Sequence, residues 1–138
     1  MIVLDTNVLS ALMRATPDRE VVTWLDEQPR TSIWTTSISV LEISFGLQVM
    51  ASGRRRTALI ELFELLLARL DHRIAALDND AAQRTAELMA TRQKRGRPRD
   101  LRDTMIAGIV LARRGILATR NTAHFEDAGI PLINPWKP

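Results

Sequence analysis

Short apolar runs alternate with longer amphipathic segments along this chain. Clusters of β-branched and aliphatic residues predict buried strands at residues 2–4, 32–36, 73–77, 116–119 and 131–133. Apolar residues that recur every three or four positions predict helices at about residues 7–14, 18–28, 39–51, 55–70, 79–94 and 100–113. No internal repeat or long linker divides residues 1–138. The alternation predicts a single α/β domain with a parallel sheet.

The composition is that of a folded protein and excludes several other classes. Apolar residues make up 46% and charged residues 25% of the chain, which excludes a disordered tail or a collagen-like protein. The absence of cysteine removes disulfides, zinc–thiolate sites and cysteine nucleophiles. No apolar run is long enough to span a membrane, and the segment after Met1 lacks the basic start of a signal peptide. We therefore expect a cytoplasmic protein without membrane contact.

Basic residues are concentrated in two segments. Lys and Arg total 19 against 16 Asp and Glu, for a net charge of +3, and all but two of the basic residues are arginine. One cluster is Arg54–Arg56, and the other spans residues 92–102, where Asp100 is the only acid. Such segments are typical of a protein with a polyanionic partner, although a solvated surface accounts for them equally well.

Asp5 comes directly after the first predicted strand and directly before a predicted helix. In open parallel sheets, ligands bind just outside the carboxyl ends of the strands, so this position favours a functional carboxylate. Asp is also a preferred N-cap residue, and a capping role for Asp5 is equally consistent with the sequence.

Glu42 lies one turn into the predicted helix at 39–51. The spacing Ser39-x-x-Glu42 fits a capping box, in which the glutamate bonds back to the cap amide. Gly46 lies one turn further along the same face and leaves room beside the carboxylate for a backbone or a ligand, which capping would not require. The helix also carries an apolar stripe, formed by Ile38, Leu41, Phe45 and Val49.

Asp103 is near the start of the most apolar helix of the chain. Asp100 is well placed to cap this helix, and an acid three residues later is favoured by the helix dipole. Because this helix must be buried on almost all sides, we expect the Asp103 carboxylate at the edge of the core, where burial without a partner is costly. Capping therefore accounts for Asp100 and leaves Asp103 available for chemistry.

Asn121 follows the strand at 116–119 and so reaches the same edge of the sheet as Asp5. It is either a turn residue or the source of a carbonyl oxygen for a metal ion or a metal-bound water. The sequence thus predicts a cleft in which Asn121 joins the three carboxylates of Asp5, Glu42 and Asp103. These carboxylates repel one another unless a cation lies between them. Oxygen ligands without cysteine or a well-placed histidine suit Mg²⁺ or Mn²⁺. Such a cation beside basic residues is what cleavage of a phosphodiester bond requires.

Five short segments, in order and spread over nearly the whole chain, carry a family resemblance. They are Val3–Asn7, Ser39–Ile43, Asp103–Ala107, Thr119–Thr122 and Ile133–Trp136. The first four resemble the sequence motifs of PIN-domain nucleases, and the last resembles the VapC- and FitB-type toxins of bacterial toxin–antitoxin pairs.

The resemblance implies a PIN-like α/β fold with a central parallel sheet of four or five strands flanked by helices. It implies a Mg²⁺- or Mn²⁺-dependent endoribonuclease that cuts cellular RNA, and a cognate antitoxin that occludes the cleft. It also implies a homodimer, and a toxin–antitoxin complex that binds promoter DNA only through the antitoxin.

Residue by residue, Asp5, Glu42 and Asp103 match the metal-binding acids of the family. Asn121 stands where many PIN domains have a fourth aspartate, and His124 stands where relatives often have another acid. Three carboxylates then imply one bound metal ion, with Asn121 orienting the water or the substrate. The alternative is a catalytically weak PIN-fold module that binds RNA or acts as an antitoxin-bound co-repressor.

Overall fold

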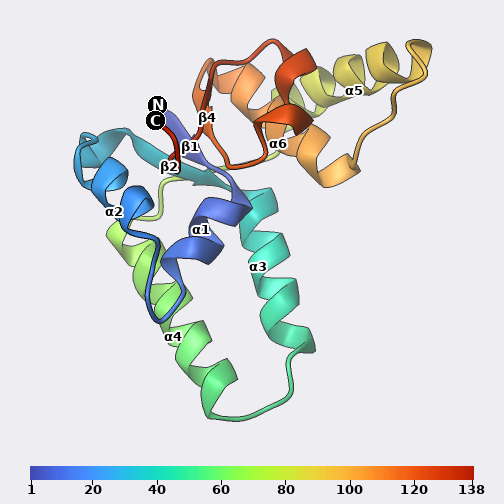
Figure 1. The fold of residues 1–138 in the computed structure, drawn as a ribbon. Helices are drawn as coiled ribbons and strands as arrows, with labels where there is room; N and C mark the ends of the chain where they lie inside the picture. The colour runs from blue at the N-terminus through green and yellow to red at the C-terminus, as the bar shows by residue number, and fades with distance from the viewer.

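Five parallel strands form the centre of the molecule (Figure 1). The computed structural model describes all residues, 1–138. The strands are β1 (Ile2–Leu4), β2 (Ile33–Thr36), β3 (Ile74–Ala75), β4 (Ile116–Ala118) and β5 (Leu132–Ile133). Their order in the sheet is β3-β2-β1-β4-β5, so the N-terminal strand lies in the middle. The predicted α/β class and the parallel sheet of five strands are confirmed.

Helices occupy the positions that the apolar periodicity predicts, within a few residues at each end. They are α1 (Thr6–Leu12), α2 (Arg19–Asp26), α3 (Ser37–Val49), α4 (Arg54–Arg69), α5 (Asn79–Lys94) and α6 (Leu101–Arg113). Short 3₁₀ turns are η1 (Arg30–Ser32), η2 (Thr122–His124) and η3 (Glu126–Ala128). The strand expected at 73–77 shortens to two residues, because only Ile74 and Ala75 pair with β2.

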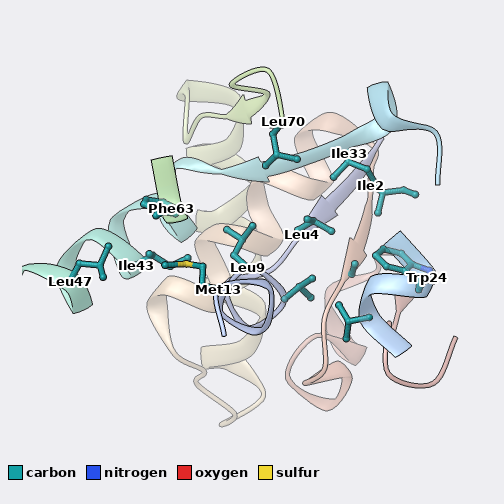
Figure 2. Packing of buried hydrophobic residues seen from close by; sticks show 13 residues of the cluster. Ile2, Leu4, Leu9, Met13, Trp24, Ile33, Ile43, Leu47, Phe63 and Leu70 are labelled. Atoms are coloured by element: carbon teal, nitrogen blue, oxygen red, sulfur yellow. The ribbon is translucent and has the colours of Figure 1, made fainter. Parts of the chain in front are cut away.

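Each face of the sheet packs against its own group of helices. Successive side chains of a strand point to opposite faces, and on β1 the side chains of Ile2 and Leu4 join one core while Val3 joins the other. The first core contains buried residues of α1, α2, α3 and α4 (Figure 2). The second consists mainly of α5 and α6, which lie side by side on the opposite face (Figure 1).

A glycine allows α5 and α6 to approach closely. A Cβ atom added at Gly108 would lie 1.9 Å from Oγ1 of Thr85 and 2.9 Å from the carbonyl oxygen of Ala81, both on α5. No larger side chain fits this position without moving the helices apart. The contact fixes α6 against α5 and thereby fixes the first turn of α6, which carries Asp103.

The start of α3 differs from the sequence prediction, and α6 ends at Arg113, as predicted. Thr36 caps α3 by accepting a hydrogen bond from the Ser39 amide at 3.1 Å, so the capping box predicted for Ser39 and Glu42 is wrong. At the end of α6, Arg114 rather than Gly115 has the left-handed conformation, with φ of +54°. Gly115 instead passes close to the backbone of Met1, where a Cβ atom would be 3.4 Å from the Met1 carbonyl oxygen.

Only Ile38 of the apolar stripe predicted on α3 belongs to the core, where it is 5% exposed. Leu41, Phe45 and Val49 are 52%, 60% and 66% exposed, whereas Ile43 and Leu47 make the buried face of the helix. Three large apolar side chains are therefore left exposed in a row on α3. None of the helices has the length and the apolar character needed to cross a membrane.

Candidate active site

Asp5 lies where β1 ends, beside the end of its neighbour β4. The Asp5 amide donates to the Ala118 carbonyl oxygen at 2.9 Å, which continues the pairing of the two strands. The Asp5 carboxylate accepts hydrogen bonds from the Thr6 amide and from the Thr119 hydroxyl, each at 2.8 Å. Asp5 therefore caps α1, as one of its two sequence interpretations predicts, and it also lines the cleft.

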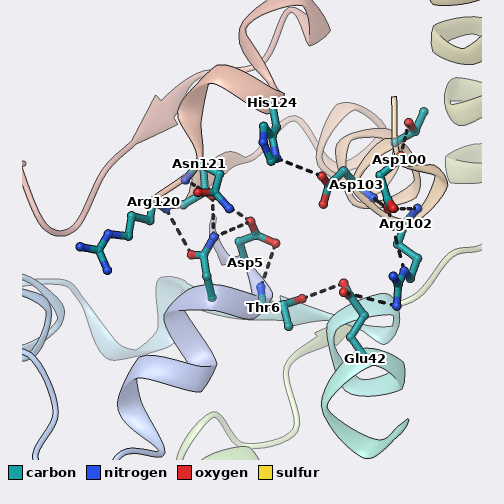
Figure 3. A network of polar contacts seen from close by, with 12 residues as sticks. Asp5, Thr6, Glu42, Asp100, Arg102, Asp103, Arg120, Asn121 and His124 are labelled. Carbon is teal, nitrogen blue, oxygen red and sulfur yellow. Dashed lines mark hydrogen bonds and ion pairs between the residues drawn. The ribbon is translucent and has the colours of Figure 1, made fainter. Parts of the chain in front are cut away.

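Glu42 faces Asp5 from the second turn of α3 (Figure 3). The Thr6 hydroxyl donates to Glu42 Oε1 at 3.0 Å and lies 2.8 Å from the Ser39 hydroxyl, which links the starts of α1 and α3. Arg102 lies 3.9 Å from the other carboxylate oxygen of Glu42. Because Glu42 takes no part in capping, its carboxylate is free to serve the cleft.

Asp103 reaches the same cleft from the first turn of α6. Asp100 caps this helix, as predicted, by accepting from the amides of Arg102 and Asp103 at 2.9 and 3.3 Å. The Asp103 carboxylate is partly buried, and Oδ2 lies 3.2 Å from Nδ1 of His124. Figure 3 shows these two side chains pointing toward each other.

Asn121 lines the cleft, and a second asparagine organises it. The Asn121 amide donates to the Thr119 hydroxyl at 3.1 Å, while the side chain stays exposed toward the cavity. Asn7 donates to the Asp5 carboxylate at 3.3 Å and to the Thr119 hydroxyl at 3.2 Å, and its carbonyl oxygen accepts from the Arg120 amide. Asn7 thus joins the two strand ends, a role that the sequence analysis missed.

A single cavity of about 370 Å³ contains all four predicted site residues. Its walls are almost entirely polar, and Arg14 and Arg120 add positive charge to them. The structure therefore brings together Asp5, Glu42, Asp103 and Asn121. Trp136 closes one side, where its indole nitrogen donates to Asp18 at 2.6 Å.

Burial raises the pKa of Asp5 to about 6, from an ordinary value of 3.8. Hydrogen bonds from Thr119 and from the Thr6 amide oppose this effect, and the nearby negative charges of Asp103 and Glu42 add to it. Asp5 is only 4% exposed, so water screens the charge of its carboxylate little. The cleft therefore holds three carboxylates, the most deeply buried of which is that of Asp5.

The donor set fits a hard divalent cation rather than zinc. No three acidic or histidine side chains are close enough to form a closed cage of protein ligands. Mg²⁺ does not require such a cage, because it keeps several waters and usually takes only one or two carboxylates directly. The negative charges of Asp103 and Glu42 help to raise the pKa of Asp5. A cation bound between the three carboxylates would relieve this repulsion.

A fully buried arginine supports the Asp103 side of the cleft. Arg92 of α5 is 1% exposed, and it donates to the Asp127 carboxylate at 2.8 and 3.0 Å, to the Thr104 hydroxyl at 2.9 Å and to the His124 carbonyl oxygen at 3.3 Å. The hydrogen bond from Arg92 is the main reason that the pKa of Asp127 lies below its ordinary value. The periodicity of α5 carried a signal for this residue, because Arg92 continues the buried face that contains Thr85 and Leu88.

Comparison with known proteins agrees with this architecture. Residues 2–130 match the model of the PIN domain family. The VapC ribonuclease Y4jK of Sinorhizobium fredii is 42% identical over 100% of this chain and 99% of its own length.

Two solved structures extend the similarity to the fold. A structure of FitAB bound to an IR36 DNA fragment has a TM-score of 0.91 and 30% identity, and it covers 100% of this chain and 97% of its own. A toxin–antitoxin complex from Klebsiella pneumoniae has a TM-score of 0.69 and 25% identity, with both chains covered completely.

Proposed function

This chain belongs to the PIN domain family, as a VapC-type ribonuclease toxin of a toxin–antitoxin system, and we propose that Asp5, Glu42 and Asp103 hold its catalytic metal ion. The proposed ion is Mg²⁺ or Mn²⁺. When bound, it would polarise the phosphate as a Lewis acid and lower the pKa of a water molecule. The activity is endonucleolytic hydrolysis of phosphodiester bonds in RNA.

The observation that carries this proposal is the convergence of three carboxylates, one of them buried with a raised pKa, in a cavity that also contains arginines. A buried carboxylate close to two other carboxylates lowers the free energy of unfolding unless a ligand binds to it. Such an arrangement therefore favours a ligand-binding role. Thr119, Asn7 and the Thr6 amide fix the orientation of the Asp5 carboxylate. The ligand geometry is thus set before any cation arrives.

The remaining cleft residues act on the substrate. Arg14 and Arg120 line the cavity beside the acids, where their guanidinium groups can bind phosphate oxygens of the RNA and offset the negative charge of the cleft. Asn121 offers a side-chain amide at the strand end to orient the attacking water or the substrate. Unpaired RNA is the expected substrate, because its backbone can bend into a cleft of this size. Because its substrate is RNA, we expect the protein to act in the bacterial cytoplasm.

The antitoxin has a groove available next to the cleft. A cavity of about 700 Å³ lies between α1, α3 and α4, and it shares Thr6 and Glu42 with the active-site cavity. Gly46 borders it, and nothing lies within 4 Å of the position where its Cβ would be, which confirms the room expected beside Glu42. An amphipathic segment laid in this groove would block access to the acids.

The exposed stripe of Leu41, Phe45 and Val49 on α3 supports a homodimer. A second copy of the chain would bury these side chains across a symmetric interface. Promoter DNA would then reach the complex through the antitoxin, in keeping with the DNA held by the FitAB structure.

A cleavage assay tests the metal-dependent activity. The protein is freed of antitoxin by unfolding and refolding, and then incubated with single-stranded RNA in Mg²⁺, Mn²⁺ or EDTA. Asp5→Asn should lower the rate at least about 100-fold, since it removes a proposed ligand. Glu64→Gln removes the same charge from an exposed site on α4 and should leave the rate unchanged.

The assay distinguishes this proposal from a binding module. RNA that shifts on a gel but remains uncut with either metal would favour the catalytically weak alternative. Cleavage that persists in EDTA, or that is equal in Asp5→Asn and wild type, would contradict the proposed metal site.

A further inference from the structure

A second, strongly basic cavity lies at the junction of α5 and α6. It has a volume of about 290 Å³, and no apolar residue contributes to its walls. The lining residues are Arg92, Arg95, Arg97, Arg99 and Asp127. Four arginines and one aspartate therefore line the same small space.

Three of these arginines have charges that the protein does not pair. Arg92 and Asp127 form a two-bonded ion pair and so satisfy each other. Arg95, Arg97 and Arg99 form no ion pair with any carboxylate, although the charge of Arg99 helps to lower the pKa of Asp127. Positive charges gathered at one place repel one another, and a bound anion relieves that repulsion.

The basic loop is held in place by its backbone. Gly96 has a φ of +67° and donates from its amide to the Gln93 carbonyl oxygen at 3.0 Å. The Arg97 amide donates to the Arg92 carbonyl oxygen at 2.9 Å. This pair of bonds closes the last turn of α5 in the manner of a Schellman motif, and Pro98 restricts the residue before it. The arginines therefore extend from an ordered support, which lowers the entropic cost of binding.

The basic cavity adjoins the active site through His124 and Asp127. Arg92 holds the backbone of His124, and the His124 ring lies 3.2 Å from Asp103 at the edge of the cleft. The loop that carries Arg95, Arg97 and Arg99 also leads directly into α6, whose first turn presents Asp103 (Figure 1). His124 thus contacts both Asp103 of the cleft and Arg92 of the basic cavity.

We infer that this cavity binds phosphate groups of the RNA that flank the scissile bond. The inference rests on the proposed function and assigns part of its substrate path. Because the walls contain no apolar or aromatic side chain on which a base can stack, the site contacts the backbone and carries no sequence information. It increases the affinity for longer RNA without choosing where the RNA is cut.

The test compares two triple variants with the same change of charge. Arg95→Gln, Arg97→Gln and Arg99→Gln together remove the basic cavity. Arg54→Gln, Arg69→Gln and Arg114→Gln together are the control, because these exposed arginines form no ion pair and lie outside both cavities. RNA affinity is measured by fluorescence anisotropy over a range of salt concentrations, with Asp5→Asn added so that the RNA stays intact. Cleavage is measured separately in the active proteins.

The cavity variant should bind long single-stranded RNA at least tenfold more weakly than the control. Each lost phosphate contact should also reduce the slope of log Kd against log salt by about 0.7. In the active proteins KM for long RNA should rise, while kcat, the cleavage positions and the rate on a short RNA confined to the cleft should not change.

Three results would overturn the inference. The two triple variants could bind RNA equally, the cavity variant could change the cleavage positions, or it could weaken only the binding of an acidic antitoxin. Affinity is measured in a variant without activity, so the result stands even if the wild type fails to cut RNA. That failure would count against the proposed function alone.

Discussion

The molecule buries charge in two neighbouring places, Asp5 and Arg92, which differ in the charge of the groups around them. At Asp5 a carboxylate is buried beside two other acids, and its pKa rises to about 6. At Arg92 a guanidinium is buried more completely, but its donors are taken by Asp127, Thr104 and the His124 backbone. The pKa of Asp127 falls accordingly.

The difference separates a site built for a ligand from a site built for the fold. Burying a charge costs little free energy when its hydrogen bonds are satisfied and an opposite charge is close. Like charges held together instead lower the free energy of unfolding until a ligand binds between them. His124 lies between the two places, since its backbone contacts Arg92 and its ring contacts Asp103. The Arg92–Asp127 pair thus provides a firm support next to the cleft that contains the three acids.

Breaking the Arg92–Asp127 pair should have the largest effect on stability. Asp127→Asn leaves the Arg92 charge buried without its partner, and we expect the free energy of unfolding in urea to fall by about 3–5 kcal/mol. Arg92→Met together with Asp127→Asn should recover part of that loss, because no buried charge then remains unpaired.

An exposed ion pair provides the control for this measurement. Arg84→Met removes an arginine that contacts Asp80 and Glu87 on the surface of α5, and it should cost less than about 1 kcal/mol. If Asp127→Asn and Arg84→Met had equal effects, the Arg92 pair would not have the structural role that we assign to it. The contribution of Asp127 should also disappear in acid, below its ordinary pKa of 3.8, as the carboxyl takes up a proton.

Removing the Asp5 carboxylate should raise the free energy of unfolding, whereas Asp127→Asn lowers it. The folded protein binds a proton at Asp5 more tightly than the unfolded chain does, so this group lowers stability as the pH rises from about 4 to about 6. Without metal at pH 7.5, Asp5→Asn should therefore be more stable than the wild type by up to about 3 kcal/mol, the equivalent of the pKa difference. Thr119 and Asn7, which donate to Asp5, lose part of their bonding in the variant and reduce this gain.

The pH dependence identifies the source of the gain. The difference between Asp5→Asn and wild type in EDTA should shrink toward zero as the pH is lowered from 7.5 to about 4. Glu64→Gln serves as the matched control and should follow the wild type across the range. A stability difference that stays constant with pH would show that Asp5 acts through packing or hydrogen bonds rather than through its buried charge.

The sequence was sufficient for most of the fold because the helices and strands are regular. A short apolar run predicted β1 as a buried strand, and helix periodicity located α5 from Asn79 to Lys94. It could not tell which apolar stripe of α3 is buried, because Leu41, Phe45 and Val49 are as regularly spaced as Ile43 and Leu47. That choice depends on the rest of the tertiary structure, which periodicity does not contain.

The site was predictable where strand ends and helix starts fix it, and unpredictable where loops fold back. Asp5 and Asn121 follow adjacent parallel strands, so their proximity follows from topology. The contact of His124 with Asp103 was not predicted from the sequence, because nothing local shows that η2 turns its ring toward that carboxylate. The Ser39 capping box failed for a related reason, since Thr36 is an equally good cap and lies at the true end of β2.

Divalent metal gives the smallest effect and the most direct comparison of the two places. If the cleft binds Mg²⁺, a concentration ten times the Kd should stabilise the wild type by about 1.4 kcal/mol, because the ion binds only the folded state. Asp5→Asn should respond far less at the same concentration, whereas Asp127→Asn should gain as much as the wild type does relative to its own metal-free form. Potassium chloride at matched ionic strength controls for screening. A response lost in Asp127→Asn but kept in Asp5→Asn would reverse the assignment, with the ligand site at the Arg92 pair and the structural charge in the cleft.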